Sequence, residues 1–179
     1  EMTERLERVL EELKRKSDEH IKTDEELLRR LEKKSRDHLR ELEEILRRLE
    51  REAREVKRNR TSEEVIKELA KRLRESLERL RKTLDELVKD MERVLRTSER
   101  TLEELVRDLE RILKELKDAD SADREALKKV EDAIDKLRRD NERSLERTKR
   151  EIERLIRENK DVLDKIEKRI RELIEELER

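Results

Sequence analysis

Apolar residues recur along the chain with a period of eighteen residues. Stacking residues 1–18, 19–36 and 37–54 brings apolar side chains to shared slots, such as the one that holds Leu10, Leu28 and Leu46. The same period returns in the stretches that start near residues 63 and 123. Because eighteen residues make five turns of α-helix at about 3.6 residues per turn, each apolar stripe stays on one face. The pattern therefore predicts straight helices, whereas a heptad repeat would impose a left-handed supercoil.

Two short segments interrupt this helical pattern. In the first, Asn59 tolerates the left-handed conformation that ends helices, and Thr61 followed by Glu64 has the spacing of a capping box. In the second, Asp120 or Ser121 is expected to cap the helix that follows. The chain is thereby divided into three predicted helices, at about residues 2–57, 62–116 and 121–178.

The connections and the stripes together predict how these helices pack. Connections of a few residues make consecutive helices antiparallel neighbours. Each apolar stripe covers roughly 120–140° of its helix, which suits contact with two neighbours. We therefore expect an all-α fold, a straight, antiparallel, up-down-up three-helix bundle. Residues 1–179 are expected to form a single elongated domain that is a monomer and requires no partner.

Polar residues interrupt the apolar stripes without changing their phase. His20 and His38 occupy the slot that Val56 fills, and Asp24 occupies the slot of Leu42. Pairing the three helices level by level groups these and similar residues into two layers, which we expect to be buried hydrogen-bond networks. The first layer contains Ser17, His20, Asp24, Ser98, Thr101, Asn141, Ser144 and Thr148. The second layer contains Ser35, His38, Thr83 and Asn159.

Such layers have a physical use in fixing the alignment of the helices. The predicted register sets Ser98 level with both His20 and Asn141, and it sets Thr83 level with Ser35. A buried polar group without a partner costs about 1–3 kcal/mol. A network that is satisfied in one register therefore selects that register and that helix order.

The composition excludes several classes of function. The chain has 52 Lys and Arg against 53 Asp and Glu, and it contains no Gly, Pro, Cys or aromatic residue. It therefore lacks thiolate ligands, glycine-rich phosphate loops and base-stacking platforms. Evenly mixed charges argue against nucleic-acid binding, and no apolar run reaches the roughly 18 residues that span a membrane. We recognise no targeting signal and leave the localisation open; a soluble chain would stay in the cytoplasm of an expressing host.

The histidines suggest chemistry that the rest of the sequence does not support. His20 and His38 lie roughly 27 Å apart along one helix, so they cannot share a metal ion. The facing Ser, Thr and Asn residues are poor zinc ligands, so we expect no metal. Ser17, His20 and Asp24 are the residue types of a catalytic triad, but no glycine-built turn or oxyanion-hole loop accompanies them. We therefore expect no enzyme activity and no cofactor.

A sensitivity to pH is the more serious functional reading of these histidines. A histidine buried in its neutral form makes the folded state less stable as the pH falls below about 6.5, because the unfolded chain then binds the extra proton. His38 faces Leu42 one turn away and should carry this sensitivity. Asp24, one turn from His20, would stabilise the imidazolium and reverse the sign there.

The sequence resembles computationally designed helical bundles with buried hydrogen-bond networks. The resemblance rests on the restricted set of residue types, on the parametric repeat and on the two connections, Arg60-Thr61-Ser62-Glu63-Glu64 and Asp118-Ala119-Asp120-Ser121-Ala122-Asp123. It covers the whole chain and implies a structural scaffold. Some such designs are oligomers, partner-binding halves or pH-responsive assemblies. The alternative function is therefore an interaction module, which self-associates or binds a partner helix, with a pH response through His20 and His38.

Overall fold

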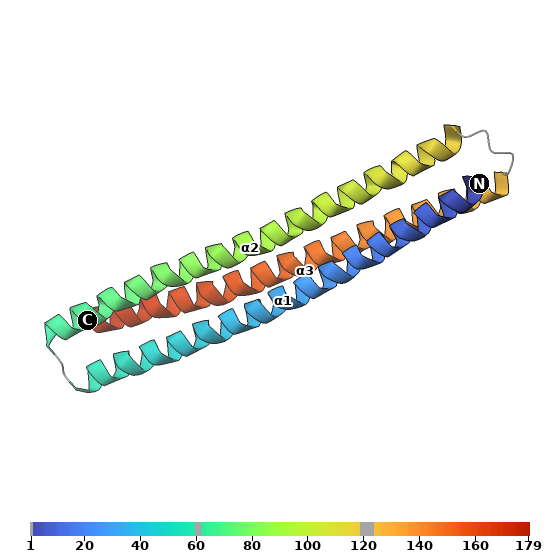
Figure 1. Ribbon diagram of the computed structural model, residues 1–179. Coiled ribbons are helices and arrows are strands. Elements are labelled where there is room, and N and C mark those ends of the chain that lie inside the picture. Colours follow the sequence, from blue (N-terminus) through green and yellow to red (C-terminus); the bar gives the residue numbers. More distant parts are fainter. Residues whose placement is uncertain (1, 60–61, 119–123) are drawn as a thin grey trace. The chain divides into compact units, whose positions relative to one another are not determined.

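The protein folds into three long helices, shown by a computed structural model that describes residues 2–59, 62–118 and 124–179 (Figure 1). Helix α1 spans Met2–Arg58, α2 spans Glu63–Asp118 and α3 spans Arg124–Glu178. No strand occurs among the residues in these ranges. The predicted all-α class is confirmed, and the first two helices end within two residues of their predicted bounds.

The start of α2 shows how the chain enters a helix. The amides of Val65 and Ile66 donate hydrogen bonds to the Ser62 carbonyl, at 3.1 and 3.3 Å. Glu63 and Glu64 place negative charge at the positive end of the helix dipole. Ser62 therefore takes the N-cap position. The predicted capping residues of the two connections, Thr61, Asp120 and Ser121, lie outside the described residues.

The tertiary contacts divide the chain into two units, and each unit contains a segment of all three helices. The first unit comprises Glu1–Arg29 and Glu92–Ile152, and the second comprises Arg30–Met91 and Glu153–Arg179. That residues 1–179 form one straight, elongated domain stays a prediction.

The second unit shows the direction of the helices. Contacts between α1 and α3 advance together along both helices, whereas contacts between α2 and α3 run in opposite directions. The pairs are His38 with Asn159, Glu50 with Arg169, Lys57 with Glu176, Arg81 with Glu167 and Arg74 with Glu178. Helices α1 and α3 are therefore parallel and α2 is antiparallel to both, which confirms the predicted up-down-up bundle.

Each unit has an apolar core built from the repeating stripe. In the first unit, Leu109 and Ile134 are among the buried residues. In the second unit, Leu42, Leu73 and Ile170 are fully buried. Burying one such side chain contributes about 1.5–3 kcal/mol, so the repeated slots supply the main driving force for folding.

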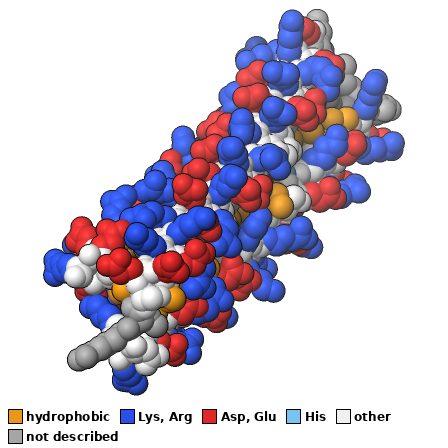
Figure 2. Space-filling model, turned by 90° about the vertical axis from the view of Figure 1, so that its left-hand side faces the viewer, with side chains coloured by type: hydrophobic (Ala, Val, Ile, Leu, Met, Phe, Trp, Pro, Cys, Tyr) orange, Lys and Arg blue, Asp and Glu red, His pale blue; other side chains and the backbone are white. Residues whose placement is uncertain are grey.

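The surface is almost entirely charged. Figure 2 shows basic and acidic side chains intermixed over one face, with few apolar groups visible between them. Among residues whose exposure is described, Val65 is the one large apolar side chain that is exposed. Across the described ranges, we find no helix with an apolar stretch of the length that a bilayer crossing requires.

Candidate functional site

A buried serine, histidine and asparagine form a hydrogen-bond network in the first unit. Ser17 and His20 lie on α1, and Asn141 lies on α3. The His20 Nδ1 atom is 3.2 Å from Asn141 Oδ1. The Asn141 amide group donates to Ser17 Oγ at 2.6 Å and to the Leu137 carbonyl at 2.7 Å. We call these three residues the first-unit network.

The second unit repeats this arrangement with residues eighteen positions later in the sequence. His38 Nδ1 is 3.0 Å from Asn159 Oδ1. The Asn159 amide group donates to Ser35 Oγ and to the Leu155 carbonyl, both at 2.7 Å. We call Ser35, His38 and Asn159 the second-unit network.

The backbone carbonyls of α3 determine which ring nitrogen of each histidine carries the proton that asparagine accepts. A carbonyl oxygen only accepts hydrogen bonds, so the amide nitrogen of each asparagine must face it. The amide oxygen is then directed at the histidine Nδ1, which must carry the proton in order to donate. In a neutral ring this leaves Nε2 as a bare lone pair. The Nε2 atoms of His20 and His38 are both buried and have no hydrogen-bond partner.

The two networks differ on the side that faces α2. In the first unit, Ser98 Oγ donates to Asp24 Oδ2 at 2.8 Å, and the same carboxylate oxygen lies 3.4 Å from His20 Nε2. In the second unit, Leu42 and Leu80 occupy the equivalent slots of α1 and α2, and both are buried in the apolar core. A carboxylate thus extends the first-unit network, whereas leucines occupy the same positions beside the second-unit network.

Two other predicted residues of the first layer lie on α3, about one and two turns after Asn141. Thr148 is buried and Ser144 is half-buried. Both line a hollow that is also lined by Ile21 and Leu28. Ser98, expected at the level of His20, bonds instead to Asp24 one turn further along α1.

The assignment of Thr83 and Thr101 to buried networks is wrong. Both side chains are exposed, and each hydroxyl donates to the carbonyl four residues earlier in its own helix, Arg79 or Thr97, at 2.9 and 3.0 Å. A threonine that bonds its own helix in this way needs no partner on another helix. A threonine at a stripe position of the eighteen-residue repeat therefore need not be buried.

Sequence reasoning missed an ion pair at the edge of the second core. Arg81 on α2 donates to both carboxylate oxygens of Glu167 on α3, at 2.5 and 3.1 Å. The Glu167 side chain is 12% exposed and that of Arg81 is 53% exposed. The hydrogen bonds from Arg81 lower the pKa of Glu167, burial opposes this shift, and attraction to Arg81 and Arg171 adds to it. The position of Glu167 next to the buried Ile166 is the sequence feature that could have predicted a partly buried carboxylate.

Each network borders a groove between α1 and α2. In the first unit, His20, Asp24 and Ser98 help to line a groove of about 420 Å³. In the second unit, His38 and Leu42 help to line a smaller one of about 150 Å³. Each buried histidine ring therefore lies beside a groove between α1 and α2.

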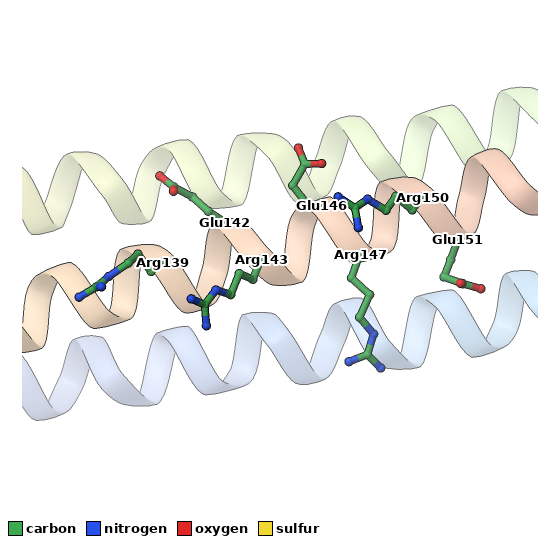
Figure 3. A pocket seen from close by; sticks show the side chains of 7 residues that line it. All are labelled: Arg139, Glu142, Arg143, Glu146, Arg147, Arg150 and Glu151. Carbon is green, nitrogen blue, oxygen red and sulfur yellow. The ribbon is translucent and has the colours of Figure 1, made fainter.

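A further hollow lies along α3 in the first unit and has a volume of about 630 Å³. Glu142 and Glu146 extend toward α2, whereas Arg147 extends toward α1 (Figure 3). Basic and acidic groups alternate along its wall, so it favours neither anions nor cations. The lining residues are Arg139, Glu142, Arg143, Glu146, Arg147, Arg150 and Glu151.

Comparison with known proteins gives a likeness to solved structures. No protein-family model matches the sequence, and no curated protein matches it. Among solved structures, the chain is similar to a protein described as a "Computationally designed three helix bundle". The identity is 17%, the match covers 98% of this chain and 86% of that one, and the TM-score is 0.48. In the described ranges, no cluster of three or more His, Asp or Glu side chains is arranged to hold a metal ion. The buried, hydrogen-bonded polar residues fit a structural scaffold.

The ion pair of Glu167 gives a testable dependence of stability on pH. Because the pKa of Glu167 is lowered on folding, the pair stabilises the protein above the ordinary value of 4.5 and loses this contribution as the pH falls below it. We expect Glu167→Gln to lower the denaturant midpoint at pH 7 and to approach the unmodified protein near pH 3. Glu175→Gln, at an exposed position, is the control. A deficit that is equal at both pH values would contradict this account.

Proposed function

We propose that the chain is a structural scaffold without catalytic activity, and that its two buried networks specify the register of the helices. The observation that supports this proposal is the repetition of one Ser–His–Asn arrangement, with the same atoms paired, in both units. In each network one residue pair comes from α1 and the asparagine comes from α3. The network is therefore satisfied only when these two helices are aligned.

The energetic cost of misalignment is larger than that of one ordinary contact. A wrong register strands an asparagine amide oxygen and a histidine Nδ1 proton away from water in each unit. Each buried group without a partner costs about 1–3 kcal/mol. Two networks therefore impose a penalty of several kcal/mol, which is comparable with the net stability of a typical domain.

The eighteen-residue repeat permits one specific wrong register. The histidine–asparagine pairs alone disfavour this register only in part. A slip of α1 by one repeat would still bring His20 to Asn159 or His38 to Asn141. One network would survive such a slip.

The difference between Asp24 and Leu42 removes this ambiguity. After a slip by one repeat, α1 would present Asp24 to Leu80 or Leu42 to Ser98. A buried carboxylate facing leucine has lost its hydrogen-bond donor, which is among the costliest defects in a core. Unequal layers thus distinguish the correct alignment from the one that the apolar repeat permits.

Replacing the networks with the apolar residues of the same slots tests this function. The variant carries Ser17→Ala, His20→Val, Asp24→Leu, Ser98→Leu, Asn141→Leu, Ser35→Ala, His38→Val and Asn159→Leu. We expect it to stay helical and stable, because buried polar groups are often replaced by apolar ones without loss. Its register should become mixed. Spin labels at Glu43→Cys and Arg79→Cys, exposed positions of a chain without native cysteine, would then report several distances.

The size of the shift makes this measurement decisive. A slip of eighteen residues moves one label by roughly 27 Å, which pulsed electron resonance resolves. The control replaces Thr83→Ala and Thr101→Ala, whose hydroxyls bond to their own helix, and it should keep one narrow distance. A single native distance in the network-free variant would show that the apolar repeat and the connections set the register without the networks.

Our second proposal is an interaction module, favoured by the grooves between α1 and α2 that the two buried histidines help to line. In this reading a second copy or a partner helix covers the grooves, and protonation of His38 weakens the contact.

The oligomeric state distinguishes the two proposals. If the scaffold is self-sufficient, sedimentation at micromolar concentration should give the mass of one chain, 22.1 kDa, at both pH 7 and pH 5. A mass of two or three chains at pH 7 that falls to one chain at pH 5 would contradict the scaffold proposal and support the interaction module.

A further inference from the structure

The Nε2 atom of His20 has a lone pair that the first-unit network does not use. Asn141 Oδ1 accepts a hydrogen bond from the protonated Nδ1, so a neutral ring presents Nε2 as an acceptor without a donor. The side chain is 6% exposed, and it lines the groove between α1 and α2. A histidine whose Nδ1 proton is held by a neighbouring oxygen is in the state in which histidines bind metal ions through Nε2.

The neighbouring carboxylate lies at the distance of a second ligand. Asp24 Oδ2 is 3.4 Å from His20 Nε2, and no hydrogen bond joins these two atoms. Zinc bonds of about 2.0–2.2 Å place two ligands of a tetrahedral ion about 3.3–3.6 Å apart. An octahedral Mg²⁺ ion, with bonds of 2.0–2.1 Å, would require about 2.8–3.0 Å. The spacing therefore fits tetrahedral Zn²⁺, and the imidazole nitrogen disfavours Ca²⁺, which prefers oxygen ligands.

We propose that His20 Nε2 and the Asp24 carboxylate form a two-ligand site for Zn²⁺ that opens into the groove of the first unit. Water from the groove completes the coordination, and the Ser98 hydroxyl holds the carboxylate in place through its 2.8 Å hydrogen bond. Two protein ligands make this a weaker site than a structural zinc centre, which has four.

The charges around the groove favour a cation. Glu19, Glu104 and Asp108 line the same groove, together with one basic residue, Lys16. This excess of carboxylates raises the local concentration of divalent ions. Because Asn141 holds the proton on Nδ1, zinc binding at Nε2 needs no change of tautomer.

The second unit supplies a matched control within the same molecule. His38 has the same partners, Asn159 and Ser35, and its Nε2 also lacks a hydrogen bond. Leu42 and Leu80 take the places of Asp24 and Ser98 there. The one carboxylate that lines its groove, Glu41, replaces neither of them. Zinc should therefore bind in the first unit and not in the second.

Calorimetric titration of the full chain, free of any affinity tag, with zinc chloride at pH 7.5 tests the proposal. We expect one Zn²⁺ per chain, with an affinity that falls at least about tenfold in Asp24→Leu. That variant copies the leucine found in the equivalent slot of the second unit. His38→Leu should bind zinc as the unmodified chain does. Far-ultraviolet circular dichroism verifies that each variant is folded.

A second variant and a second readout cover the case in which a buried leucine disturbs the fold. Asp24→Asn keeps an oxygen that accepts from Ser98 and removes the charge, and it should also weaken zinc binding at least about tenfold. In ¹⁵N spectra of labelled histidine, zinc should shift the Nε2 resonance of His20 and leave that of His38 unchanged. Absence of binding, binding that both Asp24 variants retain, or equal shifts of both histidines would overturn the proposal and indicate an adventitious ion only.

Discussion

The networks depend on a hydrogen bond from an asparagine side chain to a backbone carbonyl of its own helix. Asn141 and Asn159 donate to the carbonyls four residues earlier, which fixes which atom of each amide faces α1. The amide oxygen then requires a proton on the histidine Nδ1, and the remaining amide hydrogen requires the serine oxygen. One local contact thus determines the donors and acceptors of a whole layer, with no freedom left to accommodate a different neighbour.

Both units contain the same Ser–His–Asn network, but the residues next to the network differ between the units. In the second unit, Leu42 and Leu80 belong to the apolar core and leave the network without a carboxylate partner. Where Asp24 and Ser98 replace them, the layer gains a charge and a ligand-like pair of atoms. The repeat therefore supplies one network twice, and the difference at two positions gives the copies different groups toward α2.

The sequence was sufficient to predict the bundle and to group the residues of each network into one layer, but not to say which hydrogen bonds they form. The eighteen-residue period determines the buried face, and the short connections determine the offset between α1 and α3 that brings His20 to Asn141 and His38 to Asn159. The position in the repeat wrongly predicted that Thr83 and Thr101 are buried, because each threonine hydroxyl donates to a carbonyl of its own helix.

Two further details depended on more than phase. The partner of Ser98 differed by one turn, because small errors in the pairing of α1 and α2 change which side chain is in reach. The pair of Arg81 and Glu167 was missed because the partner of a long side chain at the edge of a core depends on its rotamer, which the repeat does not determine. The ¹⁵N spectrum of His38 at pH 7.5 shows whether a backbone-oriented asparagine sets the histidine tautomer. We expect a protonated Nδ1 and a bare Nε2, and a proton on Nε2 with a bare Nδ1 would rule this out.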